Sequence, residues 1–329
     1  MENCVLVTGG AGFVGSHTCK YLHRSGFRPV VYDNLSNGVG GAVQWGPFEK
    51  GELKDEAHLD AIFAKYRPQA VLHFAAFIEA GESVRDPQRF YQNNVADSLA
   101  LLRVMQLHGV DKIVFSSTAA VYGNPLYTPI PETHPFAPLN PYGHSKLMVE
   151  RILADIALAK GLGYTILRYF NAAGADPEGE LRENHQPETH LIPLVLQAAY
   201  GKRPNIAIFG TDYDTPDGTC IRDYVHVADL ASAHVLALKR LLSGSRNLTA
   251  NLGTGCGFSV REVVDTVARV TNRPIPVRIA ERRPGDPAIL IADPSLARSE
   301  LGWAPAYPEL EQQVRHAVNV LNGTRPLQG

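Results

Sequence analysis

CVLVTGGAGFVGSH (residues 4–17) joins an apolar run to a glycine cluster and then to a helical pattern. Its glycines follow the spacing Gly9-x-x-Gly12-x-x-Gly15, one residue longer in the first interval than the common Gly-x-Gly-x-x-Gly pattern. Between a strand and a helix, such glycines permit a tight turn, a close approach of the backbone to a pyrophosphate and close helix–strand packing. The N-terminus of the helix adds N–H donors and positive potential. The stretch therefore predicts a loop that binds the phosphates of a dinucleotide.

An acidic residue ends the next apolar run. RPVVYD (28–33) is strand-like, and its Asp33 comes 18 residues after Gly15. An acid at this place suits the ribose hydroxyls of NAD and repels the additional phosphate of NADP. A glycine cluster alone could be only a turn, and Asp33 could merely end its strand. Their combination in one strand–turn–helix–strand unit favours NAD binding.

Strand-like and helix-like runs alternate up to Asn171. The helical patterns are 13–26, 58–66, 87–108 and 142–160, and the strand patterns after Asp33 are 70–76, 112–117 and 164–171. This order predicts an α/β fold with a doubly wound, parallel, Rossmann-type sheet. Its ligand is expected at the carboxyl ends of the strands.

The pattern weakens after Asn171 and becomes regular again over 224–242. Residues 172–222 are rich in Pro, Gly, Asp and Asn. We therefore expect two domains, with the chain crossing between them more than once. The expected parts are an NAD-binding domain of residues 1–171, onto which 225–255 pack back, and a smaller mixed α/β substrate domain of residues 172–224 and 256–329.

The composition is that of an ordinary globular protein, with 45% hydrophobic and 19% charged residues. A formal net charge of −2 gives no reason to expect a nucleic acid or an anionic membrane as partner. The sequence contains neither a signal-peptide pattern nor an apolar run long enough to span a bilayer, so we expect a cytoplasmic protein. Its four scattered cysteines lack the CxxC spacing of zinc sites, and we expect reduced thiols and no metal.

NPYGHSK (140–146) places Tyr142 and Lys146 one helical turn apart on the same face. A nearby ammonium favours the phenolate and lowers the pKa of a tyrosine from about 10, so Tyr142 could act as a general base. Such a pair is more often a half-exposed ring beside a solvated charge. The hydroxyls of Ser116, Ser117 and Thr118 at the expected carboxyl edge of the sheet, and the phosphate loop in the same domain, favour the catalytic interpretation.

The motifs resemble those of the extended short-chain dehydrogenase/reductase family. The residues that carry this resemblance are TGGAGFVGSH (8–17), DNLSNG (33–38), SSTAAVYG (116–123) and YGHSK (142–146). Within the family the chain is most similar to the UDP-glucose (UDP-galactose) 4-epimerases. That similarity rests on HFAAFIEAGESV (73–84), YFNAAGADPEG (169–179), RDYVHVADLA (222–231), NLGTG (251–255) and RRPGD (282–286). It extends to about Trp303.

The resemblance implies an isomerase of galactose metabolism that inverts C4 of UDP-glucose and UDP-galactose through a transient 4-keto sugar, with NAD tightly bound. Tyr142 would take the proton of the 4-hydroxyl, and Thr118 would hold the 4-oxygen. Lys146 would bind the nicotinamide ribose and lower the pKa of Tyr142. The family's usual dimer, formed by helices near 87–108 and 142–160, implies a homodimer.

The resemblance also implies two sets of binding residues. The NAD set is Gly9, Gly12, Phe13, Val14, Gly15, Asp33, Asn34, Ser36, Phe74, Ala75, Asn93, Tyr142 and Lys146. The UDP-sugar set is Thr118, Tyr142, Asn171, His190, Leu191, Arg222, Tyr224, Arg283 and Asp286. Arginines suit a diphosphate because their planar fork forms bidentate, charge-assisted hydrogen bonds. Taken alone, Arg222 could equally pair with Asp223, and Arg283 could be a solvated charge.

Ala119 and Ala120 stand where related dehydratases carry an Asp–Glu pair and related decarboxylases a Glu. Alanines cannot transfer protons, so the expected outcome is epimerisation. Four further sites depart from the epimerase pattern. They are Phe77-Ile78-Glu79 where some epimerases place a lysine near the NAD phosphates, Glu52-Leu53 in place of Asp-Ile, His190 in place of an asparagine, and Leu290 at the position that gates N-acetylated sugars. Leu290 is neither the bulky tyrosine nor a small residue, so it leaves the acceptance of such sugars open.

Three alternatives remain at this stage. The same machinery would serve a 4-epimerase of UDP-pentoses or UDP-N-acetylhexosamines. A non-catalytic NAD-binding sensor or scaffold would not need the phenol of Tyr142. A net dehydrogenase would accumulate NADH with its substrate. The histidines His17, His73 and His226 lie in apolar contexts and are expected to be hydrogen-bonded core residues, not ligands.

Overall fold

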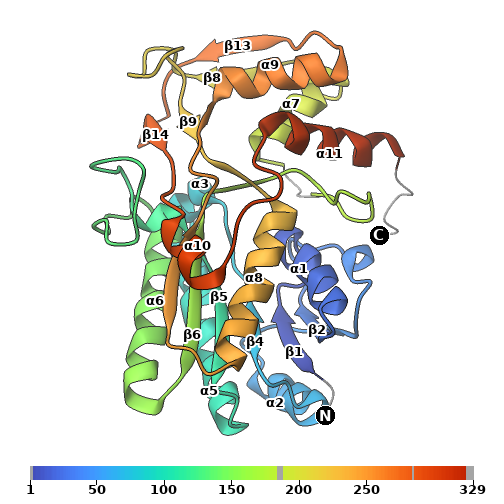
Figure 1. The fold of residues 1–329 in the computed structure, drawn as a ribbon, viewed down its shortest axis with the longest axis vertical. Coiled ribbons are helices and arrows are strands. Elements are labelled where there is room, and N and C mark those ends of the chain that lie inside the picture. The colour runs from blue at the N-terminus through green and yellow to red at the C-terminus, as the bar shows by residue number, and fades with distance from the viewer. Residues whose placement is uncertain (1–2, 184–187, 284, 324–329) are drawn as a thin grey trace.

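A seven-stranded parallel sheet forms the larger part of the molecule, with helices on both faces (Figure 1). The structure is a computed structural model that describes residues 3–183, 188–283 and 285–323. The strand order is β11-β6-β5-β4-β1-β2-β3, and every neighbouring pair is parallel. The strands are β1 (Cys4–Thr8), β2 (Arg28–Asp33), β3 (Phe48–Lys50), β4 (Val71–His73), β5 (Lys112–Thr118), β6 (Gly163–Tyr169) and β11 (Leu248–Leu252). The predicted doubly wound, Rossmann-type sheet is therefore confirmed.

The strand order reverses at β1. This strand pairs with β2 on one side and with β4 on the other, so that Thr8 lies opposite both Tyr32 and His73. In open parallel sheets, the loops diverge at such a switch point and leave a crevice at the carboxyl ends of the strands. The glycine loop that follows Thr8 opens into this crevice.

Both faces of the sheet are buried, because side chains alternate along each strand. In β1, Leu6 belongs to one hydrophobic cluster, whereas Val5 and Val7 belong to the other. In β5, Ile113 and Val114 are divided in the same way. Strands covered on both sides read as continuous apolar runs, which is the pattern the sequence shows.

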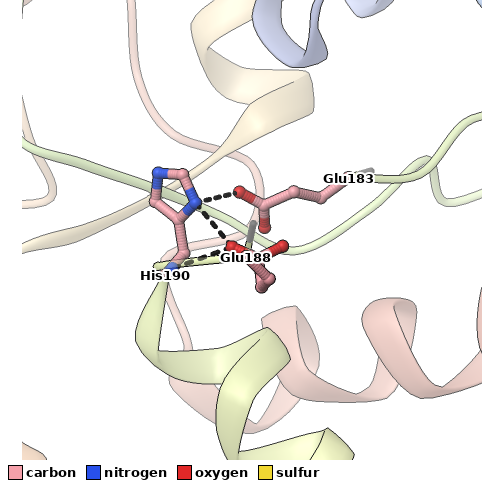
Figure 2. Close-up of side chains that lie close together, drawn as sticks. All are labelled: Glu183, Glu188 and His190. Atoms are coloured by element: carbon pink, nitrogen blue, oxygen red, sulfur yellow. Dashed lines mark hydrogen bonds and ion pairs between the residues drawn. The ribbon is translucent and has the colours of Figure 1, made fainter. Parts of the chain in front are cut away.

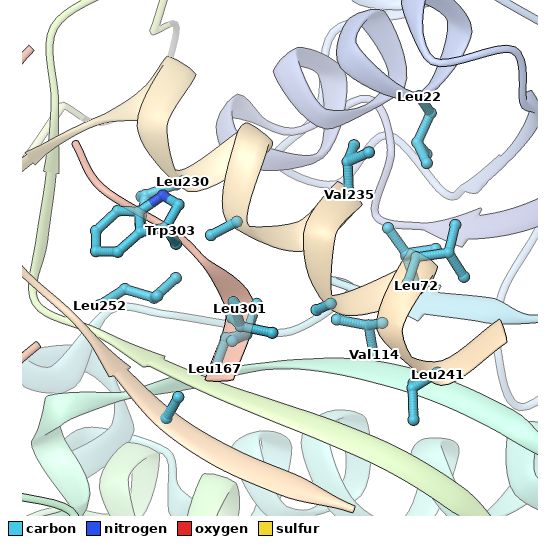
Figure 3. Packing of buried hydrophobic residues seen from close by; sticks show 14 of the residues in the cluster. Leu22, Leu72, Val114, Leu167, Leu230, Val235, Leu241, Leu252, Leu301 and Trp303 are labelled. Atoms are coloured by element: carbon cyan, nitrogen blue, oxygen red, sulfur yellow. The ribbon is translucent and has the colours of Figure 1, made fainter. Parts of the chain in front are cut away.

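One face is covered by three helices, α1 (Phe13–Arg24), α8 (Val227–Leu242) and α10 (Ser295–Leu301). Figure 3 shows Leu22 of α1 and Leu230 of α8 in the same cluster as Leu72 and Leu167 of the sheet. Trp303 completes this cluster, and its indole Nε1 donates to the carbonyl oxygen of Asp229 at 2.9 Å. The core of the large sheet therefore includes segments from late in the chain.

The opposite face is covered by α2 (Glu56–Tyr66), α5 (Asp97–Leu107) and α6 (Pro141–Lys160). Leu59, Leu101 and Leu153 supply the buried side chains of these helices. Asn140 caps α6, with its Oδ1 accepting from the backbone N–H of Gly143 at 2.9 Å, and Pro141 takes the first helical position. The start of α6 is thus set by its own sequence.

The helix predicted over 87–108 is present over 87–107, and it contains a π-helical segment. It consists of α4 (Pro87–Tyr91), the π-helical η2 (Gln92–Ala96) and α5. Asn94 lies in the π segment, where its side chain donates to the carbonyl oxygen of Phe77 at 3.0 Å and accepts from the Phe77 N–H at 2.9 Å. These contacts tie the helix to the loop after β4, which only the tertiary structure brings alongside it. The short helix α3 (Ala80–Arg85) lies in the same region.

A smaller part lies beyond the carboxyl ends of the large sheet (Figure 1). Its helices α7 (Leu191–Ala199), α9 (Val260–Thr271) and α11 (Leu310–Gly323) share a hydrophobic cluster. Its strands form two small sheets, β8 (Ile206–Phe209) with β13 (Val277–Ala280), and β9 (Ile221–Arg222) with β12 (Phe258–Ser259) and β14 (Ile289–Leu290). This is the smaller mixed α/β part that the sequence predicts.

A two-stranded ladder joins the two parts. β7 (Asn171–Ala173) pairs in parallel with β10 (Tyr224–His226), and α8 and β11 then lead back to the large sheet. Short 3₁₀ turns, η1 (Gly40–Ala42) and η3 (Ala119–Val121), complete the described elements. Among the described residues, none of the helices is both long and apolar enough to cross a membrane.

Candidate active site

A cavity of about 610 Å³ lies where the large sheet meets the smaller part. It brings together nearly all of the residues predicted for the NAD and UDP-sugar sites: Gly9, Gly12, Phe13, Val14, Gly15, Asp33, Asn34, Ser36, Phe74, Ala75, Asn93, Thr118, Tyr142, Asn171, His190, Leu191, Arg222, Tyr224, Arg283 and Asp286. The remaining predicted residue, Lys146, is buried behind the wall. Segments that are far apart in the chain thus converge on one space.

The glycine loop has the shape that its sequence predicts. Gly9 has a φ of +71°, and a Cβ at this position would lie 2.5 Å from the backbone nitrogen of Ala75. A Cβ on Gly15 would lie 2.3 Å from the carbonyl oxygen of Gly9. Both positions therefore require glycine, one for the turn and one for close packing of α1.

The N-terminus of α1 opens onto this cavity. Its N-cap is Gly12, and the helix has neither a side-chain cap nor an acid in its first turn. The N–H groups of that turn and the helix dipole therefore favour an anionic group there. This end of the cavity fits the pyrophosphate of a dinucleotide.

Asp33 holds the glycine loop from the end of β2. Its Oδ2 accepts from the N–H of Ala11 at 3.0 Å, and its Oδ1 accepts from the N–H of Leu35 at 2.8 Å. Burial raises the pKa of Asp33, and these two hydrogen bonds oppose that rise. Asp33 thus shapes the loop as well as lining the cavity.

Tyr142 enters the cavity from the first turn of α6, and Thr118 enters from the end of β5. A Cβ on Gly143 would lie 2.7 Å from the carbonyl oxygen of Ala120, so α6 starts in close contact with η3. This contact brings the two hydroxyl side chains near each other, so that Thr118 acts on the pKa of Tyr142. The arrangement can hold an oxygen atom and move a proton at one point.

The electrostatics of Tyr142 differ from the prediction. Burial raises its pKa, as does the neighbouring Tyr169, and the hydrogen bond with Thr118 opposes this effect only in part. The sequence predicts a lowered pKa instead. Desolvation of the phenolate outweighs the other contributions in this structure.

Lys146 lies one turn further along α6. Its Nζ donates to the carbonyl oxygen of Ser116 at 2.9 Å and lies 4.9 Å from the centre of the Phe115 ring. Burial lowers the pKa of Lys146 to about 7, although the carboxylate of Glu150 raises it. The low dielectric around this pair therefore favours the neutral form of both Tyr142 and Lys146.

The opposite wall of the cavity is cationic. Arg222 donates through Nη2 to Oδ1 of Asp286 at 2.5 Å, and Arg283 lies over the Phe209 ring, 3.9 Å from its centre. Asp223 instead accepts from the N–H groups of Thr254 and Gly255. Arg222 is therefore paired with another lining residue and not with its neighbour in sequence.

Sequence reasoning missed several lining residues. Arg203 and Arg278 line the cavity, yet neither belongs to a matching motif. Tyr169 also lines it, and its hydroxyl lies 2.6 Å from Oγ of Ser116. A basic residue in a loop or on a short strand carries no signal of its own in a single sequence.

His190 and Leu191 stand where α7 begins. The Nδ1 of His190 lies 2.7 Å from Oε1 of Glu183 and 2.9 Å from Oε1 of Glu188 (Figure 2). Burial alone would lower the pKa of His190, but these two carboxylates raise it to about 10. The sequence predicts that His190 contacts the substrate, and it does not predict this cluster of His190 with Glu183 and Glu188.

The positions that depart from the epimerase pattern are spread around the site. Glu52, Leu53 and Ile78 line the cavity, whereas Leu290 pairs with Arg222 across β14 and β9 outside the lining. Glu79 accepts from the side chain of Asn37 at 3.1 Å. The position predicted to gate N-acetylated sugars thus lies beside Arg222 on the neighbouring strand.

The three histidines predicted to be core residues are buried and hydrogen-bonded. His73 lies within 2.7 Å of Thr8 Oγ1 and 2.8 Å of Ser98 Oγ, and His17 donates to the Phe13 carbonyl oxygen. His226 pairs with His316. These contacts agree with a structural role.

Comparison with known proteins gives the same picture. The chain matches the NAD dependent epimerase/dehydratase family over residues 5–253. It is 54% identical over 306 residues to the UDP-glucose 4-epimerase of Rhizobium meliloti (strain 1021), which covers 93% of each chain. The crystal structure of UDP-glucose 4-epimerase from Brucella ovis in complex with NAD is 51% identical, with a TM-score of 0.95 and coverage of 97% of this chain and 98% of that one. The UDP-glucose-4-epimerase of Stenotrophomonas maltophila, with bound NAD and formylated UDP-arabinopyranose, is 41% identical, with a TM-score of 0.94 and coverage of 98% of both chains.

Proposed function

The chain belongs to the NAD dependent epimerase/dehydratase family, and we propose that it acts there as a UDP-glucose 4-epimerase. It is then an isomerase that reversibly inverts C4 of UDP-glucose and UDP-galactose. The observation that carries the proposal is the single cavity in which Tyr142 and Thr118 meet the glycine loop and two arginines. The relative and both solved structures described above are named UDP-glucose 4-epimerases, and each aligns with nearly the whole of this chain. These similarities support the proposal.

The glycine loop is the proposed NAD site. Gly9, Gly12 and Gly15 leave the backbone of the first turn of α1 accessible to a pyrophosphate, and Asp33 is placed to accept from ribose hydroxyls. Lys146 would hold the nicotinamide ribose. When bound there, NAD would supply the redox chemistry of the reaction, as acceptor and then donor of the hydride of the sugar's C4.

Tyr142 is the proposed acid–base residue. Burial favours the neutral phenol in this structure, and the proposed reaction uses the ionised form, which accepts the proton of the 4-hydroxyl and gives it back when the keto sugar is reduced. The Thr118 hydroxyl holds the 4-oxygen beside that phenol, which is supported by the place of both side chains in the lining of one cavity. Lys146 favours the phenolate when its own amine is protonated.

The two alanines after Thr118 limit the outcome of the reaction. Ala119 is buried and Ala120 follows it in η3, so these positions present only methyl groups next to the proposed 4-oxygen site. Elimination or decarboxylation of a 4-keto sugar needs a group that transfers a proton. Return to a C4 alcohol is therefore the proposed fate of the sugar.

The smaller part is the proposed UDP-sugar site. Arg222 and Arg283 reach the cavity beside Asn171 and Tyr224, and their guanidinium groups suit a diphosphate. We propose the division into domains that the sequence predicts, 1–171 with 225–255 for NAD and 172–224 with 256–329 for the UDP sugar, with one exception: α10 and Trp303 pack in the core of the large sheet. A cytoplasmic location is also proposed, since Cys19, Cys220 and Cys256 are thiols without disulfides.

A homodimer through α5 and α6 is proposed as well. These helices expose large apolar side chains, namely Leu107 at 75%, Met148 at 42% and Leu158 at 89%. Burial of such side chains against a second copy would remove them from water. Light scattering of the purified protein should give twice the 35.9 kDa mass of one chain, and the mass of one chain would contradict the proposal.

The decisive experiment is incubation of the purified protein with UDP-galactose, without added NAD, followed by chromatography of the products. UDP-glucose should form, with no net NADH. Accumulation of NADH would instead indicate a dehydrogenase, and the absence of any product after NAD supplementation would indicate a non-catalytic NAD-binding protein.

A second substrate class needs a parallel measurement. The Stenotrophomonas structure carries a UDP-pentose derivative, and Leu290 lies outside the lining of the cavity. Turnover of UDP-arabinose and UDP-N-acetylgalactosamine should therefore be compared with that of UDP-galactose. A higher kcat/KM for either one would replace the proposed hexose substrate.

A further inference from the structure

Three side chains with metal-ligating atoms converge outside the proposed reaction centre. Oxygen atoms of Glu183 and Glu188 and a ring nitrogen of His190 all lie within 4.8 Å of one another. Figure 2 shows both carboxylates turned toward the same nitrogen, Nδ1 of His190. Sequence reasoning predicted no metal site, because it considered cysteine spacing and isolated histidines.

The cluster places two acceptor oxygens at one ring nitrogen. A ring nitrogen carries one hydrogen at most, yet Oε1 of Glu183 and Oε1 of Glu188 lie 2.7 Å and 2.9 Å from this one atom. The two carboxylate side chains are only 7% and 9% exposed. Buried carboxylates this close to each other are unfavourable unless positive charge balances both of them.

The carboxylate of Glu188 is also held in place. Its Oε1 accepts from the backbone N–H groups of Thr189 and His190, each at 2.8 Å, at the start of α7. Hydrogen bonds of this kind orient the ligating carboxylates of metal sites. The cluster is therefore organised by the backbone of the α7 N-terminus and does not depend on mobile side chains alone.

A second cavity provides access to the cluster. It has a volume of about 280 Å³, and its lining includes Glu183 and Glu188 together with Arg182 and Lys202. His190 lines the large cavity, so the cluster lies between the two spaces. Such a position leaves room for water ligands and a route for an ion.

We propose that Glu183, Glu188 and His190 bind one divalent transition-metal ion. Two carboxylates and one imidazole suit Zn²⁺ or Mn²⁺, whereas the nitrogen ligand disfavours Mg²⁺ and Ca²⁺. The ion balances both carboxylates, and it links Glu183 to the start of α7, where Leu191 begins the wall of the large cavity. Its role is structural, and the proposal is independent of the reaction that the site catalyses.

The test measures metal content directly. Purified protein that retains its NAD is stripped with a chelator, dialysed in separate arms against ZnCl₂, MnCl₂ and MgCl₂, desalted and analysed by elemental mass spectrometry. We expect one Zn²⁺ or Mn²⁺ per chain and no retained Mg²⁺. We also expect a higher melting temperature with the bound ion, since a ligand of the native state stabilises it.

Matched variants separate this site from adventitious binding. Glu183→Gln preserves the size of the side chain and should abolish retention of the ion. Glu178→Gln is the control, because Glu178 is exposed and pairs with Arg24, and it should leave the metal content unchanged. If Glu183→Gln lowers the content of folded protein, Glu188→Gln provides the second test, with circular dichroism as the check on folding. A wild-type protein that retains no ion, or a folded Glu183→Gln variant that retains as much as the wild type, would overturn the proposal.

Discussion

The loop after β1 and the cationic wall around Arg222 line the same cavity, but they are built in different ways. The loop is one continuous stretch, and its shape depends on backbone geometry at Gly9 and Gly15. The wall takes its side chains from α7, from β9 and β10, and from Arg283 and Asp286, three regions that are separate in the sequence. A site formed by backbone atoms can be recognised from a short motif in the sequence. A site formed by side chains from distant segments depends on how those segments pack.

The largest effect is expected where the two regions meet, at Tyr142. Tyr142→Phe should lower kcat by about 10²–10⁴-fold, because the variant loses the group that moves the proton. The NAD content should stay the same, since the glycine loop is untouched. The measurement is turnover of UDP-galactose together with the NAD bound per chain.

Tyr127→Phe is the matched control for that change, because Tyr127 is 50% exposed and does not line the cavity. It should turn over substrate like the wild type. Near-normal turnover of Tyr142→Phe would mean that another residue is the base.

Gly15→Ala tests the backbone-built region. The new Cβ would lie 2.3 Å from the carbonyl oxygen of Gly9, so either the loop or α1 has to shift. The protein should lose bound NAD and melt at a lower temperature. Absorbance of released NAD and thermal unfolding would measure both effects.

Gly81→Ala is the control for this substitution. A Cβ on Gly81, in α3, meets no atom within 4 Å, and alanine is favoured over glycine in helices by about 0.5–1 kcal/mol. Its stability should be equal or slightly higher. If Gly15→Ala retained full NAD content, the loop would not depend on its backbone as argued above.

Arg283→Gln tests the side-chain-built wall. Loss of a charge-assisted hydrogen bond costs about 1.5–3 kcal/mol, so KM for UDP-galactose should rise about 10- to 100-fold while NAD content is unchanged. Arg282→Gln is the matched control, since the neighbouring Arg282 pairs with Asp212 at the surface. Equal effects of the two substitutions would argue against diphosphate binding by Arg283.

The smallest effect is expected at Asp229, where α8 contacts the segment that leads to α11. Asp229 accepts from the N–H groups of Ala306 and Tyr307, and burial raises its pKa to about 6 from 3.8. Between these two pH values the folded state binds more protons than the unfolded state, so this group's contribution to stability falls as pH rises. Asp229→Asn should therefore become more stable relative to the wild type from pH 4 to pH 7, as measured by urea unfolding. A difference that does not change with pH would contradict this.

Much of the sheet and of the reaction centre was predictable because the signals are local. The apolar runs of β1, β2 and β5 and the capped start of α6 each specify their element within a few residues. The π-helical segment at Asn94 was not predictable, since Asn94 forms its hydrogen bonds with Phe77, 17 residues away. The pKa of Tyr142 was predicted with the wrong sign, because helical spacing reports the neighbouring charge and not the burial of the ring.

By itself, the sequence determined the doubly wound sheet, the glycine loop and the spacing of Tyr142 and Lys146. Each of these follows from contacts between residues close in the chain or from the conformational freedom of glycine. Only the tertiary structure decided that Arg203 and Arg278 line the cavity, that Arg222 pairs with Asp286, and that two buried carboxylates meet on His190. The physical reason is that charge pairing and desolvation depend on distance in space. They act between any groups that packing brings together, however far apart these groups stand in the sequence.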